Sequence, residues 1–300
     1  MRPSDALLAA GFSTAWRLAR LAPEGPAYAA ADAVADRVTH ADGRSVRTLR
    51  RNLARAVPPD RLEATVRAGV RSYVRYWLDA FRLPSWSAER VTAPVRTEGM
   101  GLLHATLGAG RGVVGALAHL GNWDHAGAWA ARELAPVTTV AERLRPEGVY
   151  RRFVAYRARL GIEVLPLSGG PPPLPLLAER LRGGGFVPLL CDRDLSGHGV
   201  TVDLVGEPAR VAAGPAALAA RTGAALHPVT VHHERNAASP NGWGLVVVVH
   251  PEVPVTGRGA VRRAVQGYAD AWSTAIRAHP EDWHMLQRVF VADLDPSPAP

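Results

Sequence analysis

The segment Ala118-His119-Leu120-Gly121-Asn122-Trp123-Asp124 connects a strand-like apolar run to a helix-like run, and this junction indicates the fold class of the chain. The residues before it, 112–117, form a short apolar run long enough for one buried strand. The residues after it, 126–134, are rich in alanine and typical of a helix. His119 therefore follows the end of a strand, and Asp124 lies in the first turn of the next helix. In α/β folds, ligands bind at this kind of junction.

The spacing of His119 and Asp124 favours a loop that folds the two side chains together. On one continuous helix, residues five apart point away from each other. Asp124 would lie near the positive end of a helix dipole, which favours the ionised carboxylate. A carboxylate beside an imidazole fixes its tautomer and stabilises the imidazolium, so we predict His119 as a general base oriented by Asp124. A purely structural pair is the alternative. Gly121-Asn122 supplies a tight turn and an N-cap, and Asn122 is also predicted to contact substrate.

Downstream of residue 98, helical and strand patterns alternate, which predicts a largely parallel sheet with helices on both faces. This α/β core is expected over 98–290. The expected helices cover 99–109, 123–134, 147–159, 172–182, 214–222, 258–278 and a short stretch at 280–287. The expected strands cover 112–118, 136–140, 162–166, 186–190, 225–232 and 243–250, with a short β segment near 200–205.

The first 82 residues predict a helical layer, with turn signals at 23–26, 42–43 and 58–59 between four helices. The first helix, 4–22, is amphipathic, with Leu7, Leu8, Phe12 and Trp16 near one side. It packs on the protein's own core or lies in a membrane interface. It carries charges and is too short and polar to span a bilayer, and it lacks the features of a signal peptide. We expect one domain over 1–300, with a membrane-facing layer at 1–82 and a disordered tail at 291–300.

Composition favours anionic partners. The chain has 300 residues, a net charge of +8 and 35 basic residues, all of them arginine. Guanidinium groups bind phosphates in a bidentate manner, so anionic lipid, phosphorylated cofactors and nucleic acid all fit this charge. The arginine cluster at 47–55 has few aromatic neighbours, and we therefore expect no nucleic-acid partner. The single cysteine, Cys191, excludes an intramolecular disulfide and is expected to be a buried thiol.

Further polar groups follow other predicted strands. Glu142 follows strand 136–140, and Asp192-Arg193-Asp194 follows strand 186–190. Because the carboxyl ends of parallel strands share one edge of a sheet, His119, Glu142 and Asp192 are expected to lie near one another there. Arg157 and Arg159, in the helix between, could pair with a carboxylate or a phosphate. The alternatives are a solvated loop carboxylate for Glu142 and an ion pair with Arg193 for Asp192.

No residue cluster predicts a metal site. His232, His233 and His250 have no carboxylate or cysteine at ligand spacing, so we expect no metal. Trp283-His284 is expected to be a packing anchor, with a role in the site as the alternative.

Five segments in a fixed order resemble the bacterial lipid A and lysophospholipid acyltransferases. They are the His-x-x-x-x-Asp motif from His119 to Asp124, Arg47-Thr-Leu-Arg-Arg-Asn-Leu, Asp192-Arg-Asp-Leu, Val211-Ala-Ala-Gly-Pro-Ala-Ala-Leu-Ala and Pro280-Glu-Asp-Trp-His. The likeness spans roughly residues 5 to 290, and it is strongest to the actinobacterial phosphatidylinositol mannoside acyltransferases.

The resemblance implies transfer of a palmitoyl-like chain from acyl-coenzyme A to a sugar hydroxyl, as on the mannose of a phosphatidylinositol mannoside. It implies that His119 and Asp124 are catalytic together with an acidic residue after the fourth strand, which we place at Asp192 with Asp203 in reserve, and that Glu142 and Arg157 line the site. Arg193 and Asn122 are also predicted to bind substrate, Arg193 because the phosphates of coenzyme A need cations and the chain has no lysine. No cofactor is expected besides acyl-coenzyme A as co-substrate. The expected partners are this donor, a glycolipid acceptor and an anionic membrane surface, at the cytoplasmic face of the cell membrane. Another glycolipid or a lysophospholipid is the alternative acceptor, and a non-catalytic lipid-binding module or a hydrolase is the alternative function.

Overall fold

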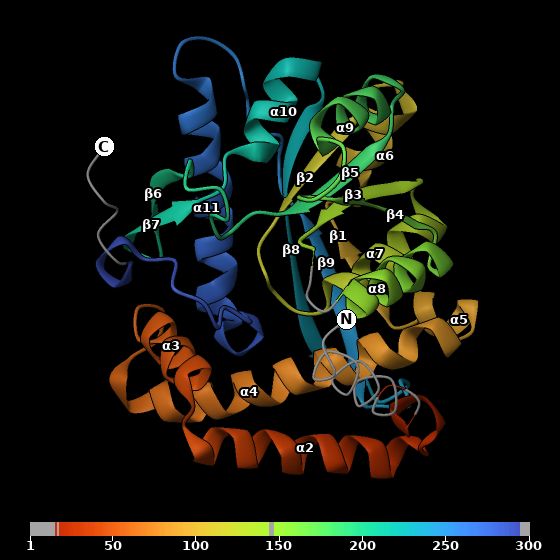
Figure 1. The fold of residues 1–300 in the computed structure, drawn as a ribbon, viewed down its shortest axis with the longest axis vertical. Helices are drawn as coiled ribbons and strands as arrows, with labels where there is room; N and C mark the ends of the chain where they lie inside the picture. Colours follow the sequence, from red (N-terminus) through yellow and green to blue (C-terminus); the bar gives the residue numbers. More distant parts are fainter. Residues whose placement is uncertain (1–15, 17, 144–146, 295–300) are drawn as a thin grey trace.

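The computed structural model of the chain describes Trp16 and residues 18–143 and 147–294. A seven-stranded sheet runs through the molecule in the order β1-β9-β8-β2-β5-β3-β4 (Figure 1). Neighbouring strands are parallel except for β8 and β9, and β6 and β7 form a separate antiparallel hairpin. The strands are β1 (Val95–Glu98), β2 (Val113–Leu117), β3 (Val137–Ala141), β4 (Ile162–Pro166), β5 (Phe186–Leu190), β6 (Val200–Leu204), β7 (Glu207–Val211), β8 (Ala225–Arg235) and β9 (Trp243–Val249).

Helices cover both faces of this sheet. Strand β2 is buried along its whole length, and its side chains alternate between two apolar clusters. Val113 and Leu117 join the cluster shared with α7 (Trp123–Glu133) and α8 (Glu147–Arg159), whereas Val114 and Ala116 join the cluster shared with α9, α10 and α11. The remaining bounds are α6 (Met100–Gly108), α9 (Pro173–Arg182), α10 (Gly214–Thr222) and α11 (Ala260–Ala278). A fully apolar central strand is what burial on two faces requires.

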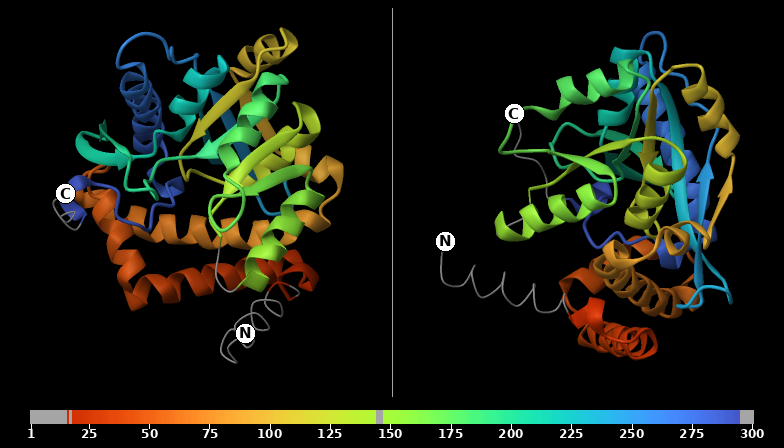
Figure 2. Two further views of the ribbon diagram at one scale, coloured as in Figure 1. Left: turned by 45° about the horizontal axis from the view of Figure 1, so that its top comes forward. Right: turned by 90° about the vertical axis from the view of Figure 1, so that its right-hand side faces the viewer.

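The N-terminal helices lie across one end of the sheet, below it in Figures 1 and 2. They are α2 (Glu24–Ala41), α3 (Arg44–Leu53) and α4 (Pro59–Arg82), followed by the 3₁₀ turn Leu83–Ser85 and the short α5 (Ala88–Thr92). Helix α4 packs against α2, α3 and the 3₁₀ turn Pro280–Asp282 near the C-terminus. The N-terminal layer is therefore placed next to the carboxyl ends of the central strands.

The predicted fold class is confirmed, with a mostly parallel sheet between helical layers and an N-terminal helical region. Several short elements differ from the prediction. The short elements α5, β1 and β7 were not predicted, because runs of four or five residues carry little periodicity. The helix predicted at 280–287 is wrong beyond Asp282, since the chain there extends and Trp283 forms a β-bridge with Leu120.

Most of the predicted amphipathic helix at 4–22 lies outside the described residues, and so does the predicted disordered tail from residue 295 onward. Within that tail, Val291–Asp293 is a 3₁₀ turn rather than disordered. Trp16 packs its ring on Phe81, Phe153 and Tyr156. None of the helices in the described part of the chain is both long enough and apolar enough to cross a membrane.

Candidate active site

Three predicted site residues meet where neighbouring parallel strands end. His119 follows β2, Asp192 follows β5 and Glu142 follows β3, and these strands are adjacent in the order β2-β5-β3. Because the three strands run in the same direction, their carboxyl ends share one edge of the sheet. The topology thus brings together residues that are up to 73 positions apart in the sequence.

The imidazole of His119 is paired with the carboxylate of Asp192. Nδ1 of His119 lies 2.5 Å from Oδ1 of Asp192, and the backbone N–H of His119 donates to Oδ2 at 2.9 Å. Asp192 is completely buried, whereas the side chain of His119 is 18% exposed. A carboxylate on Nδ1 holds the proton there and leaves the lone pair on Nε2, which is the arrangement of a general base.

Asp192 is kept ionised by its surroundings. Burial by itself raises the pKa of a carboxyl group, but the charge of His119 and hydrogen bonds from the His119 ring, the His119 backbone and the Trp283 indole outweigh burial and lower the pKa of Asp192. The indole N–H of Trp283 donates to Oδ2 at 3.2 Å. The fully buried Trp283 is therefore more than the packing anchor that its sequence suggests.

The predicted pairing of His119 with Asp124 is not what the structure shows. Asp124 lies in the first turn of α7, as predicted, but its carboxylate accepts a bidentate pair of hydrogen bonds from Arg157, at 2.7 and 3.2 Å. The hydroxyl of Tyr76 donates a third bond, at 2.9 Å. All three side chains are largely buried. Asp124 thus orients Arg157, and Asp192 takes the position beside His119 that the sequence assigned to Asp124.

A segment near the C-terminus holds the loop that carries His119. The backbone N–H of Gly121 donates to the carbonyl of Asp282 at 2.9 Å, and the N–H of His284 donates to the carbonyl of His119 at 2.8 Å. The carboxylate of Asp282 is itself buried. It accepts hydrogen bonds from the hydroxyl of Ser72, the backbone N–H of His233 and Nδ1 of the His233 ring. The position of His119 therefore depends on residues 282–284 as well as on β2.

Gly121 allows the loop that carries His119 to lie close to the backbone of Val231. Its φ is +59°, and a Cβ atom built there would lie 2.7 Å from the carbonyl oxygen of Val231. We expect Gly121→Ala to destabilise the fold by about 1–3 kcal/mol, since it adds left-handed strain and a steric clash. Thermal unfolding followed by circular dichroism measures the change. Gly148→Ala is the matched control, because Gly148 lies in α8 with nothing near its Cβ position, and it should leave the melting temperature equal or slightly higher. Equal melting temperatures for the two variants would contradict this expectation.

His119 opens into a cavity of about 200 Å³, which we call the His119 cavity. Its polar lining consists of His119, Glu142, Arg157 and Arg193. Its remaining walls are aromatic or apolar, namely Tyr76, Trp77, Trp123, Val140, Ala141, Tyr150, Phe153, Val154, Val164, Leu167, Leu190 and Leu195. An apolar cavity into which a small number of polar groups converge is typical of a small-molecule site.

A smaller neighbouring cavity of about 60 Å³ lies between α7 and the sheet. It shares Trp123, Val140, Arg157 and Leu190 with the His119 cavity, and Gly127 and Ile162 narrow it. A Cβ atom at Gly127 would lie 3.1 Å from Cδ1 of Ile162. We call this the inner slot, and its lining is mostly aliphatic.

The remaining predicted residues lie as follows. Glu142 and Arg193 form an ion pair at 3.0 Å in the wall of the His119 cavity. Asn122 does not line the cavity; it is buried, and its Oδ1 accepts the N–H of His125 as the N-cap of α7, so its predicted contact with substrate is not supported. Asp203, the reserve for Asp192, caps the turn between β6 and β7 through Gly206. Of the two candidates that the sequence left open, Asp192 is the one that lies beside His119.

Sequence reasoning missed Tyr76, which has no signal in its own neighbourhood because it reaches the site through tertiary packing. Trp283 lies in one of the five ordered segments, and its hydrogen bond to Asp192 agrees with the alternative of a role in the site. Cys191 is a buried thiol, as predicted, and burial raises its pKa well above the ordinary value. Among the described residues, there is no group of three or more His, Cys, Asp or Glu side chains placed to hold a metal ion.

Comparison with known proteins shows the family of the chain. The family model for bacterial lipid A biosynthesis acyltransferases matches residues 6–291. The chain belongs to this family. Family membership confirms the resemblance seen in the ordered sequence segments, and it makes the His119 cavity the candidate site of an acyltransferase.

Two relatives within the family are similar over most of their length. A phosphatidylinositol mannoside acyltransferase of Mycolicibacterium smegmatis is 46% identical over 288 residues, which cover 95% of this chain and 91% of the relative. A protein of the same name from Mycobacterium tuberculosis is 47% identical over 255 residues, which cover 83% of this chain and 78% of the relative.

Proposed function

We propose that the chain transfers a fatty acyl group from acyl-coenzyme A to a sugar hydroxyl of a phosphatidylinositol mannoside. The observation that carries the proposal is the His119–Asp192 pair at the mouth of a mostly apolar cavity. The names of the relatives support the acceptor. A thioester can be attacked by an alkoxide without a metal, provided that a base removes the hydroxyl proton.

In this mechanism, Nε2 of His119 takes the proton of the acceptor hydroxyl, and Asp192 stabilises the imidazolium that forms. The oxygen attacks the thioester carbonyl, and the tetrahedral intermediate collapses as the carbon–sulfur bond breaks. The imidazolium then returns its proton to the departing coenzyme A sulfur. Asp192 acts by fixing the ring and balancing its charge, as in other His–carboxylate pairs.

Arg157 is the cation best placed to meet negative charge in the His119 cavity. Asp124 occupies Nε and Nη2 of its guanidinium, and Nη1 has no hydrogen-bond partner among the described residues. We assign Arg157 to the thioester oxyanion or to a coenzyme A phosphate. Exposed Arg159 and the Arg193–Glu142 pair are further candidates for the phosphates.

The inner slot is the proposed place for the distal end of the acyl chain. Gly127→Val should fill part of the slot and shift the preferred donor from palmitoyl-coenzyme A to a donor with a shorter acyl chain. One methylene group in an apolar pocket changes kcat/KM by roughly tenfold or more. The measurement is kcat/KM for acyl-coenzyme A donors of increasing length. Gly101→Val, with open space around its Cβ position on α6, is the control and should keep the wild-type preference. An unchanged chain-length profile for Gly127→Val would exclude the slot.

Mass spectrometry of lipid products tests the acceptor. Purified protein is incubated with palmitoyl-coenzyme A and separate acceptors: a phosphatidylinositol mannoside, another glycolipid and a lysophospholipid. We expect a mass gain of one acyl group on the mannoside. If only the other glycolipid or the lysophospholipid is acylated, the proposed acceptor is wrong and that lipid takes its place. Hydrolysis of the donor without transfer to any acceptor would indicate a hydrolase. Binding of lipid without turnover would indicate a lipid-binding module.

We further propose that the N-terminal layer rests on an anionic membrane at the cytoplasmic face. Its support is a recess of five arginines (Arg44, Arg47, Arg50, Arg51 and Arg288), together with exposed apolar side chains nearby in the sequence (Leu18, Leu21, Val34 and Val38). Arg50 is neutralised by Asp42 and Glu63, but Arg44, Arg47 and Arg51 have no carboxylate partner within the described residues. Clustered cations of this kind attract anionic headgroups.

Binding to vesicles that contain anionic phospholipid should weaken as salt rises, because the screening length falls to about 10 Å at 0.1 M. Reversing Arg44, Arg47 and Arg51 to Glu should abolish sedimentation with the vesicles. A triple reversal of exposed arginines on α9, α10 and α11 (Arg182, Arg221 and Arg262) is the control and should bind nearly as well as wild type. Equal binding by both triple variants would contradict the assignment of the surface.

A further inference from the structure

The loop between β5 and β6, residues 193–199, forms part of the wall of the His119 cavity. Arg193 and Leu195 of this loop line the cavity, and Leu195 is 49% exposed, so it lies at the rim. Asp194 stands between these two residues. It does not line the cavity, and its side chain is only 6% exposed. The mechanism proposed above gives this buried carboxylate no role.

The loop is built around the carboxylate of Asp194. Its Oδ1 accepts the backbone N–H and the hydroxyl of Ser196, at 2.9 and 2.8 Å. Its Oδ2 accepts the backbone N–H of Gly199 at 2.6 Å. Arg210 of β7 lies 3.7 Å from Oδ2 and donates to the carbonyl of Gly197 at 2.9 Å. One side chain thus ties both the middle and the end of the loop to its start.

Asp194 is ionised at neutral pH. Burial by itself raises the pKa of a carboxyl group, but the hydrogen bonds from Gly199 and Ser196 and the charge of Arg210 outweigh burial and lower the pKa of Asp194. Hydrogen bonds to an ionised acceptor are stronger than those between neutral groups. Removal of this carboxylate therefore takes away the main contacts that keep the loop in one conformation.

The position of Asp192 does not depend on these contacts. Its carboxylate is hydrogen-bonded to His119 and to Trp283. The backbone of Cys191, one residue earlier, is bonded to the last residue of β2 and to the residue that follows β7. If residues 193–199 loosen, the two lining side chains of the loop should move while the His119–Asp192 pair stays in place.

We propose that Asp194 is a positioning residue for the acyl-coenzyme A donor and acts through Arg193 and Leu195. This inference rests on the proposed function. With the thioester at His119 and the acyl chain inside, the coenzyme A arm leaves through the rim, where Leu195 can pack on it and Arg193 can meet a phosphate. Arg193 gives Nη2 to Glu142, and its Nε and Nη1 have no hydrogen-bond partner within the described residues. A loop that is ordered in advance lowers the entropic cost of donor binding.

Steady-state kinetics on the full chain tests the proposal, with palmitoyl-coenzyme A and the acceptor varied separately. Asp194→Ala should raise KM for the donor about tenfold, because the loop loses its charge-assisted hydrogen bonds and has to be ordered by the donor. The value of kcat and the acceptor KM should stay within about twofold of wild type, as expected when only ground-state binding is lost. Asp194→Asn should raise the donor KM less, since its oxygen can still accept from Ser196.

Gly199→Ala disturbs the same loop and leaves the carboxylate in the sequence. A Cβ atom at Gly199 would lie 2.7 Å from Oδ2 of Asp194, so the carboxylate has to move. The donor KM should therefore rise as it does in Asp194→Ala. Gly108→Ala is the control, because nothing lies near its Cβ position at the end of α6, and it should keep the wild-type donor KM.

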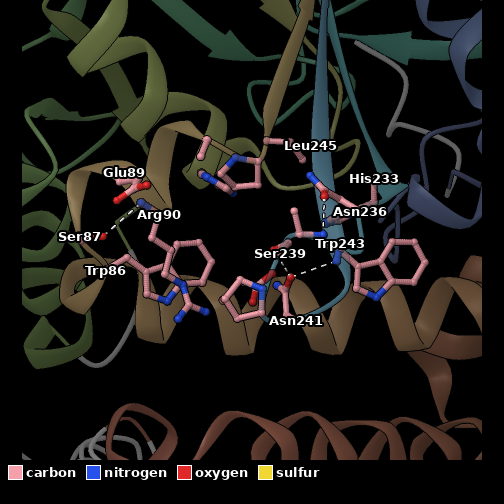
Figure 3. Close-up of a pocket in the computed structure, with 17 residues that line it drawn as sticks. Trp86, Ser87, Glu89, Arg90, His233, Asn236, Ser239, Asn241, Trp243 and Leu245 are labelled. Carbon is pink, nitrogen blue, oxygen red and sulfur yellow. Dashed lines mark hydrogen bonds between the residues drawn. The ribbon is translucent and has the colours of Figure 1, made fainter.

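Asn241→Ala is the matched control for the loss of a side chain that holds a loop. Asn241 holds the hairpin between β8 and β9, where its Oδ1 accepts the hydroxyl of Ser239 at 2.7 Å and the N–H of Trp243 at 3.1 Å (Figure 3). These residues line a separate cavity of about 270 Å³, which shares no lining residue with the His119 cavity. Asn241→Ala should lower the melting temperature, as Asp194→Ala does, but it should leave the donor KM at the wild-type value.

Donor binding without turnover separates this inference from the proposed function. The probe is a thioether analogue of palmitoyl-coenzyme A, and calorimetry measures its Kd in the absence of acceptor. If the wild-type protein neither binds the analogue nor transfers an acyl group, the proposed function fails and the inference fails with it. If wild type does both but the Asp194 and Gly199 variants keep the wild-type donor KM and Kd, the inference alone is wrong. A rise in the acceptor KM alone, or a fall in kcat alone, would also overturn it.

Discussion

His119→Ala is expected to lower kcat for acyl transfer by about 10³-fold or more, and it should also lower the melting temperature, because the buried Asp192 carboxylate loses its partner. General-base catalysis contributes roughly 10²–10⁴-fold, and the alanine variant also loses the proton that the base returns to the leaving sulfur. His119 is partly exposed, but its ring is hydrogen-bonded to the fully buried Asp192, so kcat is compared at a temperature where both proteins are folded. The assay follows release of coenzyme A in the presence of acceptor.

His104→Ala is the matched control for this result. His104 is an exposed histidine on α6 that lines neither the His119 cavity nor the inner slot, and its replacement should leave kcat unchanged. If His119→Ala kept a tenth or more of the wild-type rate, the imidazole would not be the base, and the proposed mechanism would fail.

Asp192→Asn is expected to lower kcat by about 10²–10⁴-fold while KM for the donor changes little. The amide of Asn can still accept a bond from the backbone of His119 or from Trp283, so the loop should keep its position. It carries no charge to stabilise the imidazolium, and its N–H₂ group facing Nδ1 favours the tautomer with the proton on Nε2. The remaining nitrogen would then be unable to take the hydroxyl proton.

Asp124→Asn provides the comparison that separates the two carboxylates. It breaks a buried ion pair and leaves Arg157 without its charge partner, which costs about 3–5 kcal/mol of folding stability. We expect a lower melting temperature and a higher KM for acyl-coenzyme A, because Arg157 lines the His119 cavity. A fall in kcat alone for Asp124→Asn, with unchanged stability, would assign to Asp124 the role we give to Asp192.

Much of the α/β core could be predicted because its strands and helices are strongly patterned. The apolar run before His119 and the alanine-rich run after Asp124 place the strand–helix junction correctly, and α7 begins at Trp123. Parallel order then implies that Glu142 and Asp192 approach His119, and the structure places Asp192 in direct contact with it. The choice of partner was wrong because nearness in sequence favoured Asp124, whereas sheet order places β5 beside β2.

The helix predicted at 280–287 was wrong because the local sequence pattern carries no information on tertiary pairing. Pro280 does open a 3₁₀ turn, but Asp282 and His284 form backbone hydrogen bonds with the loop at 119–121, with Trp283 bridged to Leu120. This tertiary pairing extends the chain. Tyr76 was missed for the same reason, since the hydrogen bond from α4 to Asp124 is visible only after α4 packs on α7.

The support of the His119 loop by residues 282–284 has a consequence during translation. A nascent chain that has been synthesised through β5 already contains His119 and Asp192, but it lacks the carbonyl of Asp282, the amide of His284 and the indole of Trp283 that hold them in place. We therefore expect the His119–Asp192 pair to reach its final position only after residue 284 has emerged from the ribosome, and we expect chains that end upstream of that point to lack the proposed acyl transfer.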